Sequence, residues 1–124
     1  MVTNARQTLG ARGEDLAVAE LERQGMTILA RNWRCPVGEI DIVATEVVGD
    51  RTTVVFCEVK CRSGLGFGDP LEAITWKKLR TLRALAAEWM AAHRVRAQGI
   101  RLDAIGVVLR RGEVPRLTHV RAVG

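Results

Sequence analysis

Hydrophobic residues recur along the chain with two different periods, three to four residues in some segments and two in others. In residues 12–24, Ala17, Val18 and Leu21 share one stripe of a helix, and Gly25 follows where a C-terminal cap belongs. This spacing predicts a first helix over residues 12–24. The preceding residues 1–9 are expected to be loose.

A second helical period follows the glycine-rich loop SGLGFGDP, residues 63–70. Asp69 can cap a helix that has Pro70 at its first position, with Glu72 reaching back to complete a capping box. The pattern predicts one long helix from Pro70 to about His93. Its apolar face comprises Leu71, Ile74, Leu82, Leu85 and Trp89.

Segments rich in β-branched or alternating residues lie between and after these helices. Gly49 and Asp50 form a turn signal between two of them, so the flanking runs are expected to pair as a hairpin. The order is helix, three strands, helix, strand and short final strand. It predicts an α/β fold with a single mixed β-sheet flanked by helices, whose first three strands form an antiparallel meander. The predicted strands cover residues 26–33, 39–45, 53–61, 101–109 and 114–120.

The length of 124 residues fits a single domain, residues 1–124, which can bury roughly two-thirds of its unfolded surface. No apolar run approaches the ~20 residues that a membrane span needs. The first 15 residues also lack the apolar core of a signal peptide. We therefore expect a cytoplasmic protein without a membrane partner.

Cysteine count and net charge narrow the candidate chemistry. Three cysteines without a CxxC pair, and two isolated histidines, favour neither a disulfide framework nor a structural zinc site. The net charge of +5 and the pI near 9.9 favour a polyanionic partner, nucleic acid first. An ordinary arginine-rich surface would give the same charge.

The segment VVFCEVKCRS, residues 54–63, begins apolar on both faces of the predicted strand and ends in charges. Glu58 and Lys60 share one face, and charges that enter a covered face must be paired, ligated or exposed in a cleft. The alternative is a simple ion pair at the fraying end of the strand. The opposite face carries Cys57, Val59 and Cys61, which are interpreted as small buried hydrophobic residues.

The neighbouring segment EIDIVAT also alternates. Ile40 and Ile42 are expected on the core face, and Asp41 on the other. If the hairpin pairs as predicted, Asp41 approaches Glu58, since opposed Cβ atoms lie about 5 Å apart. Two carboxylates that close repel unless a proton or cation lies between them, and oxygen ligands suit Mg²⁺ or Mn²⁺. Lys60 could then face a group reacting at that metal.

Taken together, GEIDIVA, FCEVKCRS, a preceding GE at the start of a helix and a trailing GDPLEAITWKK resemble the YraN-like family of small bacterial proteins. That family is similar to the PD-(D/E)XK nuclease superfamily and is close in fold to Holliday-junction resolvases. The resemblance covers about residues 10–108. One departure is that Ile40 stands where the motif has its proline.

The resemblance implies a restriction-endonuclease-like core and a Mg²⁺-dependent (or Mn²⁺-dependent) endonuclease, with branched DNA as a candidate substrate. It implies catalytic roles for Asp41, Glu58, Lys60 and the helical Glu14. The implied metal ligands are Asp41, Glu58, Glu14 and the backbone carbonyl of Val59. For Glu14 the alternative is simple compensation of the helix dipole. Resolvase-like relatives act as dimers, so a homodimer is a candidate assembly.

Basic and aromatic residues near this motif are candidate contacts for nucleic acid. Arg62 points the same way as Glu58 and Lys60 if the strand continues. Basic side chains on the second helix, opposite its apolar stripe, would contact phosphates or simply be a solvated face. They are Lys77, Lys78, Arg80 and Arg83. Trp33 and Trp89 are assigned to the core, whereas Trp76 could pack inside or stack on a base.

Two other functions fit the same sequence. The chain could be a nucleic-acid-binding module that keeps a nuclease fold without cutting, or an interaction protein in a repair or RNA-processing complex. Clustered carboxylates argue against a pure binder, because they repel a phosphate backbone. Arg101 and Asp103 share a face of the fourth predicted strand and are interpreted as a structural ion pair.

Overall fold

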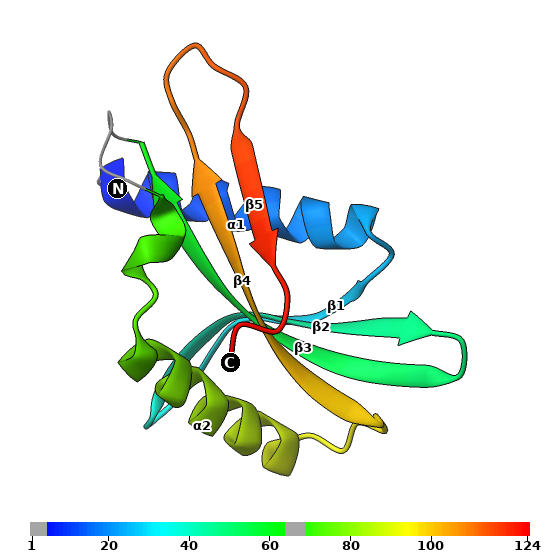
Figure 1. The fold of residues 1–124 in the computed structure, drawn as a ribbon. Helices are drawn as coiled ribbons and strands as arrows, with labels where there is room; N and C mark the ends of the chain where they lie inside the picture. Colours follow the sequence, from blue (N-terminus) through cyan, green and yellow to red (C-terminus); the bar gives the residue numbers. More distant parts are fainter. Residues whose placement is uncertain (1–4, 64–68) are drawn as a thin grey trace.

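A computed structural model describes residues 5–63 and 69–124, and most of the glycine-rich loop, residues 64–68, lies outside them. Two α-helices and a short 3-10 helix accompany one five-stranded sheet (Figure 1). The helical elements are α1 (Ala5–Arg23), η1 (Pro70–Ala73) and α2 (Trp76–Ala92). The strands are β1 (Thr27–Cys35), β2 (Gly38–Val48), β3 (Arg51–Arg62), β4 (Gly99–Val108) and β5 (Arg116–Val120).

The strands follow the order of the sequence across the sheet, β1-β2-β3-β4-β5. β1, β2 and β3 form the predicted antiparallel meander, and Gly49 makes the β2–β3 turn with a φ of +63°. β4 runs parallel to β3 because η1 and α2 carry the chain back along the sheet, and β5 pairs antiparallel at the edge. The α/β fold class and the mixed sheet are confirmed, and the element order is consistent with a nuclease-like core.

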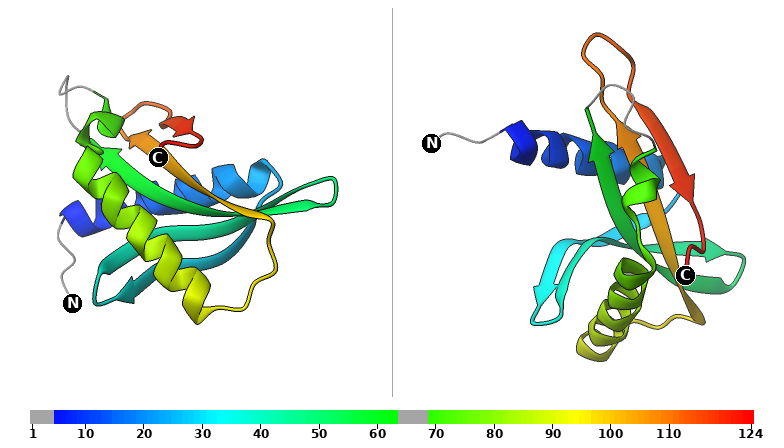
Figure 2. Two further views of the ribbon diagram at one scale, coloured as in Figure 1. Left: turned by 60° about the horizontal axis from the view of Figure 1, so that its bottom comes forward. Right: turned by 60° about the vertical axis from the view of Figure 1, so that its left-hand side comes forward.

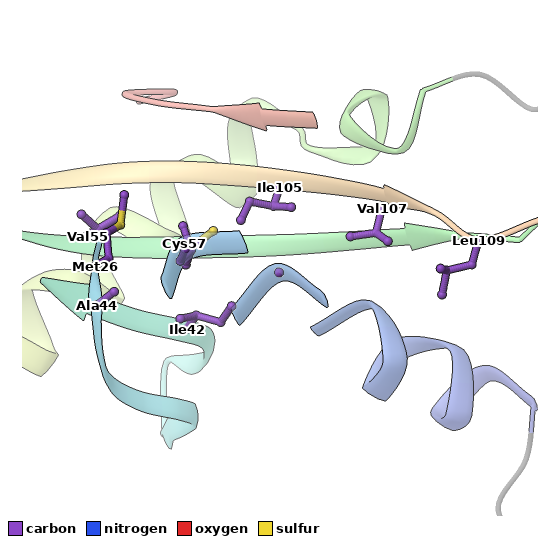
Figure 3. Packing of buried hydrophobic residues seen from close by; sticks show 10 residues of the cluster. Met26, Ile42, Ala44, Val55, Cys57, Ile105, Val107 and Leu109 are labelled. Atoms are coloured by element: carbon purple, nitrogen blue, oxygen red, sulfur yellow. The ribbon is translucent and has the colours of Figure 1, made fainter. Parts of the chain in front are cut away.

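The two helices cover opposite faces of the sheet (Figure 2). On one face Ala17 and Leu21 of α1 pack on a cluster that includes Cys57 and Ile105 (Figure 3). On the other face Leu82 and Trp89 of α2 pack on a second cluster centred on Phe56. β3 and β4 therefore have apolar side chains on both faces, as the sequence of residues 54–57 predicts for a strand that is covered twice.

The helix boundaries differ from the predicted ones. α1 begins at Ala5, so part of the start that was expected to be loose is helical, while residues 1–4 lie outside the described part of the chain. The predicted helix from Pro70 to His93 is two elements. Ile74 and Thr75 have extended backbones and interrupt it.

Each of the two helical segments has its own N-cap. The carboxylate of Asp69 accepts a hydrogen bond from Leu71 N at 2.9 Å, and Thr75 Oγ1 accepts one from Lys78 N at 3.1 Å. The Asp-Pro pair therefore starts a single turn of 3-10 helix, and the long helix begins only after the second cap. Leu82, Leu85 and Trp89 are buried as predicted.

Candidate active site

The predicted alternation of β2 breaks at Asp41. Ile42 packs in the cluster beneath α1, but Ile40 packs in the cluster beneath α2, so the two isoleucines lie on opposite faces of the sheet. The expectation that they share one face is therefore wrong. The break lies beside Asn32 of β1, which has a φ of +52° and stands between the ladder pairs Arg31–Ile42 and Trp33–Ile40.

The break also separates β2 from β3. Their ladder runs from Val48–Arg51 to Ile42–Cys57 and stops one residue before Asp41 and Glu58 would pair. Asp41 Oδ2 instead accepts a hydrogen bond from the backbone N–H of Val59 at 2.8 Å. The side chain thus satisfies the first donor that the departing strand leaves behind, and this fixes the carboxylate between the two strands.

The environment of Asp41 is unfavourable for its negative charge. Burial is the largest cause and the charge of Glu58 the second, and together they raise the pKa of Asp41 to about 7. The hydrogen bond from Val59 opposes the rise, while Glu14 and Glu39 add to it. Carboxylates from α1, β2 and β3 therefore create a negative potential at one point.

Glu58 and Lys60 form an ion pair on the same face of β3, with 3.1 Å between Lys60 Nζ and Glu58 Oε1. Both side chains are about four-fifths buried. Lys78 of α2 also reaches Lys60. Its hydrogen bond with Lys60, burial and the positive charge of Lys60 lower the pKa of Lys78. Burial acts to lower the pKa of Lys60 too, but its bonds to Lys78 and Glu58 raise it overall.

Glu14 reaches the site because α1 approaches β3 closely at Gly13. A Cβ on Gly13 would lie 2.6 Å from Cys61 Sγ, so a larger residue would push the helix away. The Glu14 carboxylate accepts hydrogen bonds from Arg31 Nε at 2.8 Å and from Asn32 Nδ2 at 2.9 Å. The alternative of compensating a helix dipole is wrong, because α1 begins at Ala5 and Glu14 lies in the middle of the helix, not in its first turn. Glu14 instead ties α1 to β1 at Arg31 and Asn32.

Two hollows open at this end of the sheet. The first, here called the acidic hollow, has a volume of about 670 Å³. The second, the helix hollow, has about 420 Å³ and lies against α2. The Glu58–Lys60 pair lies between them, because Lys60 lines the first and Glu58 the second. The acidic hollow is lined by Leu9, Gly10, Glu14, Asp41, Val59, Lys60, Cys61, Arg62 and Ser63, and the helix hollow by Glu39, Glu58, Thr75, Lys77, Lys78, Thr81, Leu82 and Leu85.

The structure thus brings Asp41, Lys60 and Glu14 to one hollow and turns Glu58 toward Lys78 in the other. Within residues 5–63 and 69–124, no three acidic, histidine or cysteine side chains converge closely enough to hold a metal ion. The reason is visible in the ion pairs, since Glu58 faces Lys60 and Glu14 faces Arg31. The predicted ligands are neighbours that each have a partner already.

The predicted basic contacts divide between the two hollows. Arg62 lines the acidic hollow, and Lys77 and Lys78 line the helix hollow. Arg80 and Arg83 are exposed on α2. Trp89 is buried and Trp33 packs against the same cluster, as predicted. Trp76, which the sequence left undecided, is 76% exposed at the start of α2.

Arg101 and Asp103 form the predicted ion pair, in the first half of β4. Asp103 is fully buried and accepts two hydrogen bonds from Arg101, one from His119 Nε2 at 2.7 Å and one from Ala122 N at 3.1 Å. Burial alone would raise the pKa of Asp103, but the bonds from His119 and Arg101 lower it to about 2. The bonds from His119 and Ala122 attach β5 and the C-terminal residues to β4, whereas those from Arg101 lie within β4 itself.

Cys57 and Cys61 pack in the core cluster beneath α1, and Cys61 also lines the acidic hollow. Cys57 is fully buried and Cys61 packs on the same cluster, and the three cysteines are free thiols. Burial raises the pKa of both Cys57 and Cys61, which disfavours the reactive thiolate. Their interpretation as small hydrophobic residues is confirmed.

Comparison with known sequences places this arrangement in a family. Residues 13–107 match the model described as "Uncharacterised protein family UPF0102", a span that holds Glu14, Asp41, Glu58 and Lys60. The chain belongs to the UPF0102 family. This is the YraN family, so the resemblance drawn from the motifs is confirmed.

The similarity extends over whole chains. A UPF0102 protein of Beutenbergia cavernae is 47% identical over 120 residues, which are 97% of this chain and 98% of the relative. One of Mycobacterium ulcerans is 48% identical over the full length of both chains. One of Renibacterium salmoninarum is 49% identical over 116 residues, 94% of this chain and 95% of the relative. These names state the family and no activity.

Several residues of the site were not found from the sequence. Arg31 and Asn32 looked like ordinary strand residues. Lys78 was predicted as a phosphate contact but not as a partner of Lys60. The asparagine gave one usable signal, because Asn tolerates the left-handed conformation that interrupts a strand. None of the helices in the described residues is long and apolar enough to cross a membrane.

Proposed function

We propose that this protein is a metal-dependent nuclease that hydrolyses phosphodiester bonds in nucleic acid. The observation that carries the proposal is Asp41, a carboxylate fixed by Val59 N–H at the split between β2 and β3, with a pKa raised to about 7. A buried carboxylate that other carboxylates destabilise is an arrangement typical of functional sites, since it costs stability in the free protein.

The donor set fits a hard divalent cation. Asp41, Glu58, Glu14 and the carbonyl of Val59 offer only oxygen atoms, which Mg²⁺ and Mn²⁺ prefer. A cation would also remove the repulsion that raises the pKa of Asp41. Because Glu58 and Glu14 face Lys60 and Arg31 in the free protein, they would have to exchange these partners for the ion. A bound ion would activate water and stabilise charge on the phosphate.

The chain itself supplies the positioning and the positive charge. Val59 N–H holds Asp41, and β3 holds Glu58 and Lys60 on one face. When a substrate phosphate enters, Lys60 can transfer its hydrogen bond from Glu58 to a phosphate oxygen, which frees Glu58 to act as a ligand. Lys60 then orients the attacking water or neutralises the developing charge.

A Mg²⁺- or Mn²⁺-dependent cleavage assay tests the proposal on junction, flap, single-strand and duplex substrates, as DNA and as RNA. DNA is the first expectation and branched DNA the leading substrate class. Asp41→Ala, Asp41→Asn and Glu58→Gln should each lower the cleavage rate by about 100-fold or more. Asp50→Asn, at the exposed β2–β3 turn, is the matched control for loss of one charge. A fully active Glu58→Gln variant would contradict the assignment of Glu58 to a nuclease site.

One observation favours a second function, a nucleic-acid-binding module that does not cut. Both Glu58 and Glu14 are already paired with cations of the chain, so these two carboxylates need no metal to balance their charges. Calorimetric titration with MgCl₂ separates the two functions. Heat of binding at millimolar Mg²⁺ that disappears in Asp41→Asn supports the nuclease, and its absence from the wild-type protein favours the binder. Sedimentation with and without substrate tests the proposed homodimer.

A further inference from the structure

A third hollow, of about 410 Å³, is lined by residues of α1, of the segment after β3 and of the turn after β4. We call it the arginine hollow. It contains three guanidinium groups from two distant parts of the chain. It is lined by Leu9, Arg12, Ser63, Leu109, Arg110, Arg111, Gly112, Glu113 and Pro115.

These arginines differ from the others that hold the fold together. Arg31, Arg101 and Arg121 each bond to a carboxylate. In the described residues, Arg12, Arg110 and Arg111 form no ion pair. Arg110 Nε is moreover buried without a hydrogen-bond partner. An unmet buried donor destabilises the free protein, so a turn of the Arg110 side chain that brought Nε to an anion in the hollow would remove that cost.

The backbone holds this part of the chain rigidly beside the proposed site. Leu109 N donates to Arg62 O at 2.8 Å, which fixes the residue before Arg110 to the end of β3. Glu113 N donates to Arg110 O at 3.0 Å and closes the turn around Gly112, whose φ is +78°. Glu113 is the acidic residue of the lining and leaves it with a net charge of +2 from three arginines and one carboxylate.

The arginine hollow continues the acidic hollow, because Leu9 and Ser63 line both. A chain of phosphates that enters the acidic hollow therefore meets these arginines as it leaves. The planar guanidinium group matches the paired oxygens of a phosphate, and Ser63 can offer a hydroxyl at the shared wall. The charge and the position both point to one anion, a backbone phosphate.

We propose that the arginine hollow is a second phosphate site, which binds a phosphodiester of the nucleic-acid strand beyond the one at Asp41 and Glu58. The inference rests on the proposed function and adds the path that the nucleic-acid strand takes across the protein. The strand runs from the acidic hollow across Leu9 and Ser63 to Arg12, Arg110 and Arg111. None of these three arginines was among the basic residues that the sequence predicted.

Binding of a fluorescein-labelled 20-nucleotide single strand, measured by anisotropy in EDTA, tests this without cleavage. Arg110→Gln with Arg111→Gln removes two phosphate contacts. Affinity at low salt should fall about tenfold and the slope of log K against log salt should shrink by about 1.4. The control is Arg94→Gln with Arg96→Gln, the same charge change at two exposed arginines in the α2–β4 connection. It should alter both quantities much less.

A second variant covers the case in which loss of the half-buried Arg110 unfolds the protein. Arg12→Gln with Arg111→Gln changes two exposed side chains of the hollow and should give the same loss. Equal losses in the control and in either hollow variant would overturn the proposal, because they would show a diffuse charge effect. Competition with sodium phosphate at constant ionic strength gives a further check. Displacement that is specific to phosphate and lost in the variant would assign the hollow to free phosphate instead.

The two proposals fail in different ways. If the wild-type protein does not bind the oligonucleotide, the proposed function and this inference both fall. If the wild-type protein binds and cleaves, and the arginine variants bind equally well, the second phosphate site alone is wrong. If the variants lose affinity while Mg²⁺ binding by calorimetry is unchanged, the arginines act on the strand and not on the metal.

Discussion

Asp41, which is half-buried, and Asp103, which is fully buried, lie on the two strands that flank β3, yet their environments shift their pKa values in opposite directions. The pKa of Asp41 rises to about 7 through burial and neighbouring acids, whereas hydrogen bonds from His119 and Arg101 hold that of Asp103 at about 2. Asp41 accepts one hydrogen bond, from Val59 N–H, and Asp103 accepts four.

This is the difference expected between a structural carboxylate, Asp103, and the functional one proposed for Asp41. Around Asp103 the arginine also bonds to Glu46, so each polar group in the cluster has partners and each charge has an opposite. Around Asp41 the nearby charges of Glu58, Glu14 and Glu39 have the same sign as its own. A fully satisfied network specifies the fold, and an unsatisfied one leaves a place for a ligand.

The largest effect on stability should come from Asp103→Asn. Loss of the charge leaves Arg101 buried without its main partner, and breaking one side of a buried pair costs about 3–5 kcal/mol. Urea unfolding followed by tryptophan fluorescence measures this at pH 7. The contribution of Asp103 is present above pH 4 and is lost as the pH falls toward 2, because its folded-state pKa is lowered.

Asp50→Asn is the control for that experiment and should change the free energy of unfolding by less than about 0.5 kcal/mol. If Asp103→Asn proves equally harmless, the network does not hold β5. Asp103 would then not be a structural carboxylate with which Asp41 can be contrasted.

Asp41→Asn should have the opposite effect to Asp103→Asn in the metal-free protein, because it should raise the free energy of unfolding. A folded-state pKa raised from 3.8 to about 7 means that stability from the protonated form is full below pH 4 and is lost as the pH rises through 7. At pH 8 the neutral amide should therefore stabilise the protein by about 2–4 kcal/mol. The amide oxygen can still accept from Val59 N–H.

Urea unfolding at pH 4 and pH 8 measures this effect, and the variant should gain stability only at the higher pH. A loss of stability at pH 8 would show that the ionised carboxylate is a structural group like Asp103, and would remove the main support for a cation site.

Mg²⁺ should give the Asp41 carboxylate a positively charged partner, as Arg101 does for Asp103. An ion that binds at Asp41 stabilises the folded state by about 1.4 kcal/mol at ten times its Kd. Thermal unfolding at pH 7.5, with KCl to match ionic strength, should show a higher Tm in MgCl₂ for the wild type. The shift should vanish in Asp41→Asn, and a shift that persists there would locate the ion elsewhere.

The contrast also explains how far the sequence could predict the molecule. The meander, the Gly49 turn and the two apolar faces of β3 follow from local patterns, and the structure has all of them. The ion pair of Arg101 with Asp103 was predictable because the two residues share one strand face. His119 was not predictable as its partner, since the contact joins residues 16 positions apart through an edge strand.

The sequence pointed to residues that meet at this candidate site, but not to their geometry. Strict alternation placed Asp41 opposite Glu58 as a cross-strand pair. In the structure the alternation breaks at Asp41, beside the left-handed Asn32, and Asp41 contacts the backbone of Val59. The partners of Glu14 depend on this same irregularity, because Arg31 and Asn32 both reach it from the disturbed stretch of β1. Position-by-position patterns assume a regular strand and miss such contacts.

The smallest effect is expected from Arg31→Gln. This variant tests whether Arg31 orients Glu14 as a fixed part of the site or only neutralises its charge. The Arg31 side chain is 40% exposed, so loss of its pairs with Glu14 and Asp15 should cost less than about 1 kcal/mol of stability each. Removal of the positive charge that is bonded to Glu14 should instead raise the affinity for Mg²⁺, by about threefold. Arg23→Gln breaks the exposed pair with Glu20 on the same helix and should leave that affinity unchanged. Calorimetry on both variants decides the matter. Weaker Mg²⁺ binding in Arg31→Gln would mean that Arg31 orients Glu14 as a fixed element of the site, as Arg101 is fixed at Asp103.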